Sequence, residues 1–271
     1  MSKNIIELAQ RILLLIAIVS ASVVGQEKNN FPYSFSRGLD MTIASVSGGL
    51  LLGSILVDYT PMGVEDIANL NSDDISSYDV KAIKNWDLNS IKMSDLLLYS
   101  SIAIPGLLLT DKTVRNDYRS FSLLWAESVF LTLGITNLTK VLVGRSRPYL
   151  YGDKAPKEYK IKDDNRKSFF SGHTSISAAS CFLMASVYDD YNPESKLSPY
   201  LWAGACFVPA LTAYYRYDAG KHFPSDLVAG YIVGSTVGIL VPRWHTKNSN
   251  INVGLTLQTS GKIKTHLSYR F

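Results

Sequence analysis

Three short polar clusters stand at the edges of apolar segments and carry residue types that can act on an anion. The first, KVLVGRSRP, begins at Lys140 and ends at Pro148. Lys140 and Arg147 are seven residues apart, about two helical turns, so the spacing predicts both cations on one side of a helix. Cations are also common at helix C-termini without any ligand, so this cluster alone predicts no site.

The second cluster, FFSGHTS, covers residues 169–175. Ser171 is a predicted N-cap for the helix that follows. The backbone N–H groups of Gly172 and His173 would then point outward, as they do where helix N-termini bind anions. A capping serine beside an incidental histidine is the alternative interpretation.

The third cluster, YRYDAGKHFPSD, contains Arg216, His222 and Asp226. Pro224 suits the first turn of a helix, and if that turn continues, Asp226 lies one turn from His222. A carboxylate there would accept a hydrogen bond from one imidazole nitrogen, fix the tautomer and leave the other nitrogen free as nucleophile or base. The alternative is a histidine–aspartate pair that only stabilises a loop.

Taken together, the clusters supply the groups that phosphoryl transfer requires. Three cations can neutralise phosphate oxygens and the charged transition state. One histidine can attack phosphorus while the other protonates the departing oxygen. This scheme needs no metal and no cofactor.

The order and spacing of these residues resemble a known family. Lys140-x6-Arg147-Pro148, Ser171-Gly172-His173 and Arg216-x5-His222-x3-Asp226 look like the three signature motifs of the type 2 phosphatidic acid phosphatase superfamily. That superfamily includes lipid phosphate phosphatases, bacterial class A acid phosphatases and vanadium haloperoxidases. Each motif alone is weak, but three in order over residues 140–226 are specific.

The resemblance implies a role for each matching residue. It makes His173 the general acid, His222 the nucleophile that becomes phosphohistidine, and Asp226 the residue that orients the nucleophile. Phe170 stands where the family usually has proline, and Tyr215 where serine is common, which puts loop shape and substrate preference in doubt. Five residues are implied to bind the phosphate: Lys140, Arg147, Ser171, Gly172 and Arg216.

Two further cations, Arg145 and Lys221, lie beside the motifs. We expect them on the solvated surface, with secondary phosphate contacts as the alternative. The polar segment 58–92 is expected to hold a short surface helix and is assigned no chemistry.

Six apolar stretches must position the clusters. They lie at 41–57, 96–110, 121–143, 174–188, 200–215 and 227–241. We read them as six helices whose small residues allow close approach. The expected fold is all-α, a six-helix bundle of the lipid phosphatase/haloperoxidase type over residues 26–245. In an up-and-down bundle the three clusters meet at one end.

Whether these helices cross a membrane is open from the sequence. Spanning needs about 20 apolar residues, most stretches are shorter, and Glu127 interrupts one of them. The mean hydropathy is only +0.07, so buried helices of a globular bundle remain the alternative. The net charge of +4, without a basic stripe, does not favour nucleic acid.

The two ends of the chain carry their own signals. Lys3 and Arg11 precede an apolar run that is followed by small residues, so residues 1–25 are predicted to be a signal peptide or an anchor helix. Either predicts a bacterial-type cell envelope, with the site facing the periplasm. Residues 246–271 alternate apolar and polar positions about Ser260-Gly261, which predicts a short β-hairpin packed on the helical body; two strands cannot close an outer-membrane barrel.

The two cysteines, Cys181 and Cys206, lie in separate apolar segments. Export would permit a disulfide, but they sit on different predicted helices. Free, buried thiols are therefore the prediction.

The function that these features predict is metal-independent hydrolysis of a phosphomonoester or pyrophosphate through a phosphohistidine. Apolar helices beside the site favour a lipid phosphate and a membrane-associated enzyme. A soluble periplasmic acid phosphatase of broad specificity is the first alternative. A vanadium haloperoxidase, with His222 binding vanadate, is a second, although the chain is short for that branch. A non-enzymatic envelope protein is the third.

Overall fold

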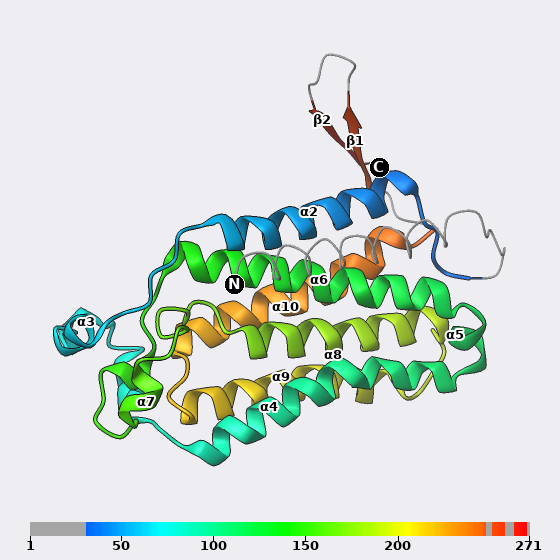
Figure 1. The fold of residues 1–271 in the computed structure, drawn as a ribbon. Coiled ribbons are helices and arrows are strands. Elements are labelled where there is room, and N and C mark those ends of the chain that lie inside the picture. The colour runs from blue at the N-terminus through cyan, green and yellow to red at the C-terminus, as the bar shows by residue number, and fades with distance from the viewer. Residues whose placement is uncertain (1–30, 248–250, 258–262, 270–271) are drawn as a thin grey trace.

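The computed structural model describes residues 31–247, 251–257 and 263–269. The predicted signal peptide or anchor at 1–25 and the predicted turn at Ser260-Gly261 lie outside these residues. The described chain forms a bundle of long helices with a cap of short helices at one end and a pair of strands (Figure 1). The predicted all-α body is thus confirmed.

Nine α-helices occur in the described residues, so the predicted count of six is wrong. The three additional helices are only four or five residues long. They lie in polar loops, where the sequence has no apolar run that would predict a helix. The long helices are α2 (Arg37–Leu56), α4 (Leu88–Ala103), α6 (Tyr118–Val143), α8 (Gly172–Tyr191), α9 (Ser198–Asp218) and α10 (Pro224–His245). The short α-helices are α3 (Val64–Ala68), α5 (Lys112–Asn116) and α7 (Lys157–Lys160). The 3-10 helices are η1 (Ser72–Asp74), η2 (Val80–Lys84), η3 (Ile104–Thr110) and η4 (Pro148–Leu150).

Helix α8 is the central helix of the bundle. It packs against α4, α6, α9 and α10, which surround it in Figure 1. Thirteen of its 20 residues are buried, and a helix buried nearly all round is a core helix. Its N-terminus, which carries the Ser171–His173 motif, is therefore held in the middle of one end of the bundle.

Glycines at every fourth position of α10 allow this helix to approach α8 closely. A Cβ atom on Gly234 would lie 2.0 Å from the backbone oxygen of Ser175, and one on Gly230 would lie 2.7 Å from the backbone oxygen of Ser171. Real Cβ atoms do not approach that closely. The glycines therefore set the distance between α8 and α10, and with it the distance between the second and third sequence clusters.

We expect Gly234→Ala to destabilise the protein, because the added methyl group must push α10 away from α8. Overpacking of this kind costs typically about 1–3 kcal/mol. Gly204→Ala on α9 is the matched control, since nothing lies within 4 Å of its added Cβ atom. Thermal unfolding in detergent measures both. Equal melting temperatures for the two variants would contradict the close packing.

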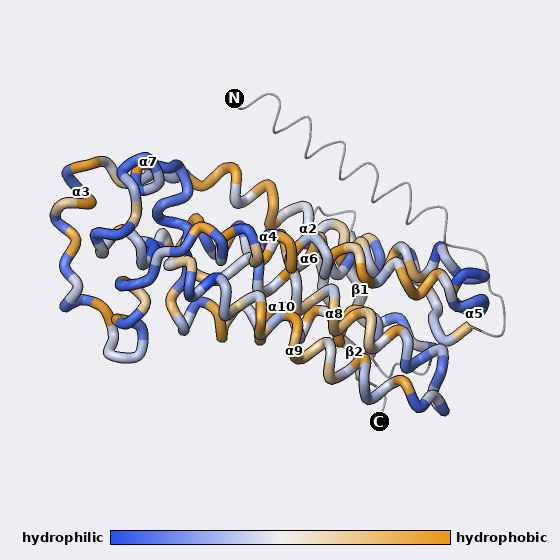
Figure 2. The backbone as a smooth tube through the Cα atoms, turned by 90° about the horizontal axis from the view of Figure 1, so that it is seen from below, coloured by the Kyte–Doolittle hydropathy of each residue, from blue (hydrophilic) through white to orange (hydrophobic). Residues whose placement is uncertain are grey.

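Within the part of the chain that the structure describes, four helical segments are long and apolar enough to cross a membrane: Arg37–Leu56, Leu88–Thr110, Tyr118–Leu150 and Pro224–His245. Large apolar side chains on the outside of the bundle, such as Leu56, Leu142 and Phe207, are exposed. Figure 2 shows hydrophobic residues along the long helices and hydrophilic stretches gathered towards the two ends, around α5 and α7. These features indicate that the protein associates with a membrane.

The C-terminal part contains two strands, β1 (Ile251–Leu257) and β2 (Ile263–Tyr269). They pair antiparallel, with Ile251 opposite Tyr269 and Leu257 opposite Ile263. β1 approaches α2, but Figure 1 shows both strands extending away from the helices. The expectation that a hairpin packs along the helical body is therefore not met.

Both cysteines are free thiols, as predicted. Cys181 is buried in α8, but Cys206 is exposed on α9, so the predicted burial of the second thiol is wrong. The apolar segment around Cys206 turns one face to the outside of the bundle, which its composition alone does not reveal.

Candidate functional site

The three sequence clusters meet at one end of the bundle, on the left in Figure 1. Lys140 lies in the last turn of α6, Gly172 is the first residue of α8, and Arg216 lies near the end of α9. His222 comes two residues before α10. Because each of these helices begins or ends at the same end of the bundle, residues far apart in sequence become neighbours there.

Arg147 is held by loops and not by α6. The helix ends at Gly144, which adopts a left-handed backbone with φ of 56°, so the predicted shared helical face with Lys140 is wrong. The Arg147 guanidinium donates from Nε to the Asp164 backbone oxygen at 2.9 Å, from Nη2 to Asp164 Oδ2 at 2.7 Å and from Nη1 to the Lys221 backbone oxygen at 3.0 Å. These bonds fix the guanidinium rigidly beside His222.

His222 is buried and its tautomer is determined by a backbone carbonyl. Its Nδ1 lies 2.8 Å from the backbone oxygen of Ser168, and a carbonyl can only accept, so Nδ1 carries the proton. Nε2 is then unprotonated, and its lone pair accepts a long hydrogen bond from Arg147 Nη1 at 3.4 Å. Burial, together with the charges of Lys140 and Arg147, lowers the pKa of His222 well below its usual value. The imidazole is therefore neutral, the form that a nucleophile needs.

Asp226 does not hydrogen-bond to His222, which corrects the predicted direct contact. Its Oδ2 lies 3.7 Å from His222 Nδ1, because α10 begins after His222 and the two residues share no helical turn. Oδ2 instead accepts from Ser168 Oγ at 2.6 Å and from the Phe223 backbone N–H at 2.9 Å, while Oδ1 accepts from Arg145 at 2.5 Å. Asp226 thus holds Ser168, whose carbonyl orients His222.

Arg145 is a structural cation, which corrects the expectation of a solvated or phosphate-binding side chain. Besides Asp226 it donates to Asp79 Oδ2 at 2.8 Å, and its guanidinium lies 4.1 Å from the centre of the Phe223 ring. Asp79 also accepts from the backbone and side chain of Ser225. The segment 58–92, for which the sequence predicts no chemistry, therefore stabilises the start of α10 through Asp79.

His173 pairs with Asp95, a carboxylate that belongs to none of the three sequence clusters. Its Nε2 lies 2.7 Å from Asp95 Oδ1 on α4, and the same oxygen lies 3.9 Å from Arg216 Nη1. Burial and the charge of Arg216 lower the pKa of His173 to about 4, against the pull of Asp95. A phosphate dianion bound among the neighbouring cations would counter Arg216 and raise this pKa, which favours the protonated form that a general acid requires.

Ser171 and Gly172 form the start of α8 as predicted. Ser171 is the N-cap, and its Oγ accepts from the Thr174 backbone N–H at 3.4 Å. A Cβ atom on Gly172 would lie 3.6 Å from Lys140 Cε, so the first amides of α8 lie beside that lysine. A helix N-terminus next to a cation is suited to binding an anion.

Positive charge exceeds negative charge around His222. Among the acidic neighbours, Asp226 is buried and already pairs with Arg145, while Asp164 and Asp95 have side chains that are 47% and 44% exposed. The described residues give Lys140 and Lys221 no ion-pair partner, and the buried Nε of Arg216 has no hydrogen-bond partner. Unpaired buried charge is costly unless a ligand compensates it. The cations whose charges act on His222 are Lys140, Arg147 and Arg216, and Lys221 acts with them on Asp164.

Lys221 is buried, which corrects its expected place on the solvated surface. Its Nζ lies 4.6 Å from the centre of the Tyr149 ring and 5.4 Å from those of Trp86 and Tyr159. Burial, with the charges of Arg147 and Arg216, lowers the pKa of Lys221 to about 7. The lysine can therefore lose its charge within the physiological range of pH.

We expect kcat/KM for a phosphate ester to fall as pH rises through the Lys221 pKa of about 7. The lysine is charged below that pH and neutral above it, so attraction for the phosphate weakens on the alkaline side. In Lys221→Arg the charge persists, and this fall, roughly fivefold between pH 6 and pH 9, should disappear. Initial rates of both proteins across that pH range test this prediction. The same dependence of kcat/KM on pH in the wild-type protein and in Lys221→Arg would contradict a role for Lys221.

One comparison with known proteins identifies a family. Residues 121–250 match the family model of the PAP2 superfamily. The matched range contains every residue from Lys140 to Asp226 that the sequence motifs single out. Neither a curated protein nor a solved structure matched the chain.

Proposed function

Because residues 121–250 belong to the type 2 phosphatidic acid phosphatase superfamily, we propose that this protein is a phosphatase acting through His222. Membership supports phosphoester hydrolysis in general. The observation that carries the specific proposal is the unprotonated Nε2 of a neutral, buried His222 beside Arg147, among cations that exceed the nearby carboxylates. A nucleophile among cations that outnumber the nearby carboxylates is suited to attack an anionic phosphoryl group.

The first step transfers the phosphoryl group to the enzyme. Lys140, Arg147 and Arg216 bind the phosphate oxygens, with the Ser171 hydroxyl and the Gly172 N–H. His222 Nε2 forms a bond to phosphorus while the bond to the leaving oxygen breaks. That oxygen keeps the electron pair and takes a proton from His173. The products are the free alcohol, or the shorter phosphate of a pyrophosphate, and a phosphohistidine.

The second step releases phosphate. Water attacks phosphorus, neutral His173 accepts its proton, and the bond to Nε2 breaks. The charge that His222 gains in the first step is stabilised at Nδ1–H by the Ser168 carbonyl, 2.8 Å away. Asp226 supports this through its hydrogen bond to the Ser168 hydroxyl. No metal takes part in either step.

We favour a lipid phosphate as the substrate class, because a cavity lined in part by apolar side chains lies next to the phosphate-binding residues. The cavity has a volume of about 520 Å³ and lies between the C-terminal ends of α2 and α6. Its apolar lining residues are Ile55, Leu56, Val57 and Val141, and its polar ones are Ser54, Asp58, Tyr59 and Lys167. The backbone oxygen of Lys167 accepts from Lys140 Nζ at 2.7 Å, so an acyl or prenyl chain in the cavity could place its phosphate beside Lys140. The proposed setting is a bacterial-type envelope membrane, with this end of the bundle facing the periplasm.

Phosphate release across a series of monoesters with increasing chain length tests this proposal. We expect kcat/KM to rise with chain length in mixed micelles, because each added methylene that enters the cavity leaves water, a gain of about 0.8 kcal/mol. Val141→Asp, which places a charge in the cavity lining, should flatten this trend. Equal activity on short aryl phosphates would favour the broad-specificity acid phosphatase instead. Halide oxidation with vanadate and peroxide would favour the haloperoxidase, and no release from any ester would exclude both phosphatases.

A further inference from the structure

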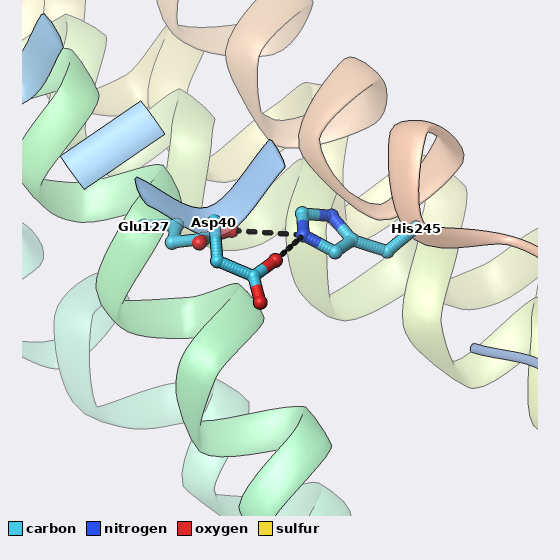
Figure 3. Close-up of side chains that lie close together, drawn as sticks. All are labelled: Asp40, Glu127 and His245. Carbon is cyan, nitrogen blue, oxygen red and sulfur yellow. Dashed lines mark hydrogen bonds and ion pairs between the residues drawn. The ribbon is translucent and has the colours of Figure 1, made fainter. Parts of the chain in front are cut away.

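Three buried ionisable side chains meet at the end of the bundle opposite the phosphatase site. Asp40 comes from the first turn of α2, Glu127 from α6 and His245 from the end of α10 (Figure 3). Figure 3 shows both carboxylates pointing at one imidazole nitrogen. His245 Nε2 lies 3.1 Å from Asp40 Oδ1 and 3.3 Å from Glu127 Oε2.

This cluster is remote from the reaction. His245 follows Asp226 by 19 positions on α10, and a rise of 1.5 Å per residue separates them by about 28 Å. None of the three side chains has a part in the two steps proposed above. A reason for burying them must therefore be sought within the cluster itself.

The hydrogen bonds of His245 leave the cluster rich in acceptors. Its Nδ1 lies 2.8 Å from the Val241 backbone oxygen, which can only accept, so Nδ1 carries a proton and the neutral ring offers a lone pair at Nε2. Both carboxylates, which can only accept hydrogen bonds, then face the lone pair of Nε2, which is a third acceptor. Even a fully protonated His245 would leave two carboxylates with one cation.

The carboxylate oxygens are also poorly satisfied. Asp40 is 0% exposed and Glu127 is 2% exposed. Asp40 Oδ2 and both oxygens of Glu127 have no hydrogen-bond partner. Ionised buried carboxylates without partners are strongly disfavoured, so an additional positive charge between the members of the cluster would stabilise it.

The spacing of the three donors fits a metal ion. One ligand atom from each residue can be chosen so that all lie within 4.8 Å of one another. Ligands about 2.0–2.1 Å from a tetrahedral Zn²⁺ lie roughly 3.3–3.4 Å apart, close to the two distances from Nε2. A metal-binding histidine commonly donates its other N–H to a backbone carbonyl, as His245 does.

The surroundings close the cluster off from water. The ring of Phe35 lies 4.8 Å from that of His245, and the Ser34 backbone N–H donates to the His245 backbone oxygen at 2.7 Å. Tyr33 forms a β-bridge with Thr246. The segment before α2 therefore covers the end of α10, a closed setting typical of structural metal sites.

We infer that Asp40, Glu127 and His245 bind one divalent transition-metal cation, Zn²⁺ or Mn²⁺, that joins α2, α6 and α10. Imidazole nitrogen favours zinc among the common cations, and carboxylate oxygen accommodates both ions. The cation supplies the missing positive charge. Its role is structural, so it holds the three helices together without touching the substrate.

Metal analysis of the full chain tests this inference. The protein is produced with Zn²⁺ and Mn²⁺ supplied, purified in detergent and dialysed, and its metal content is measured by mass spectrometry. We expect about one ion per wild-type chain and less than a tenth of that in Glu127→Gln, which keeps the shape of the side chain. The exposed Glu65→Gln on α3 is the control and should keep the metal. A wild-type chain without metal would overturn the inference and leave protons as the compensating charge.

A second measurement uses only wild-type protein, so it tests the site even if Glu127→Gln fails to fold. Wild-type protein is stripped with a chelator, and Zn²⁺, Mn²⁺ or Mg²⁺ is added back during thermal unfolding. We expect Zn²⁺ or Mn²⁺ to raise the melting temperature by several degrees and Mg²⁺ to have little effect. The absence of any rise would contradict the site. Neither measurement uses phosphate release, so the metal site and the proposed function can fail independently.

Discussion

The His222→Ala variant will release phosphate at least about a thousandfold more slowly than the wild-type protein. The substitution removes Nε2 of His222, the lone pair that attacks phosphorus in the proposed first step. Arg147, Arg216 and Lys140 remain, so the variant should still bind phosphate esters, and the loss should fall on kcat. Initial rates at saturating substrate measure the effect.

The matched control is His266→Ala. His266 lies on β2, which extends away from the bundle (Figure 1), and its replacement should leave kcat unchanged. A phosphoryl label that survives base and is lost in acid, present on quenched wild-type protein and missing from His222→Ala, would identify the phosphohistidine. If His222→Ala kept more than about a tenth of the wild-type rate, another group would have to be the nucleophile.

The second large effect is expected at Arg147. In Arg147→Lys the charge is kept, but the planar guanidinium is lost, and with it the three hydrogen bonds to Asp164 and Lys221 that fix it beside His222. An ammonium group is a single point charge that cannot make these contacts while binding phosphate. We expect kcat/KM to fall by roughly 100- to 1000-fold, with part of the loss in kcat.

Arg115→Lys provides the comparison for this variant. Arg115 is exposed on the short helix α5, away from the site (Figure 1), so its substitution should change neither kcat nor KM. Thermal unfolding of both variants separates lost catalysis from lost folding. A fall of less than about threefold in Arg147→Lys would mean that charge alone suffices and that the fixed geometry has no catalytic importance.

The sequence predicted the site best where function depends on neighbours along the chain. Ser171 caps α8 because a serine directly before a helical run can accept a hydrogen bond from a backbone N–H group of the first turn. The six apolar stretches became the six long helices, and their ends met at one end of the bundle as the up-and-down order required. The short helix α3 lies in segment 58–92, where a short surface helix was expected, but α5 and α7 were missed because four or five residues carry no periodic pattern.

Contacts made through loops and backbone atoms were out of reach of the sequence. The i, i+4 spacing of His222 and Asp226 predicted a direct hydrogen bond, but α10 starts too late for a shared turn, and the Ser168 carbonyl takes that place. A carbonyl is present at every residue and leaves no signature. Asp95 was missed for a related reason, since a lone carboxylate on α4 resembles any surface acid until the fold sets it against His173.

By itself, the sequence determined which residues can do chemistry, because motif spacing records local geometry that a chain carries with it. Tertiary structure alone decided how those residues are oriented and which distant groups support them. Asp40, Glu127 and His245 show the difference most clearly. They are separated by as many as 205 positions in the chain and match no spacing rule, yet helix packing buries them against one another. Only there does the low polarity of the interior make these three ordinary side chains a suitable site for the cation that we propose.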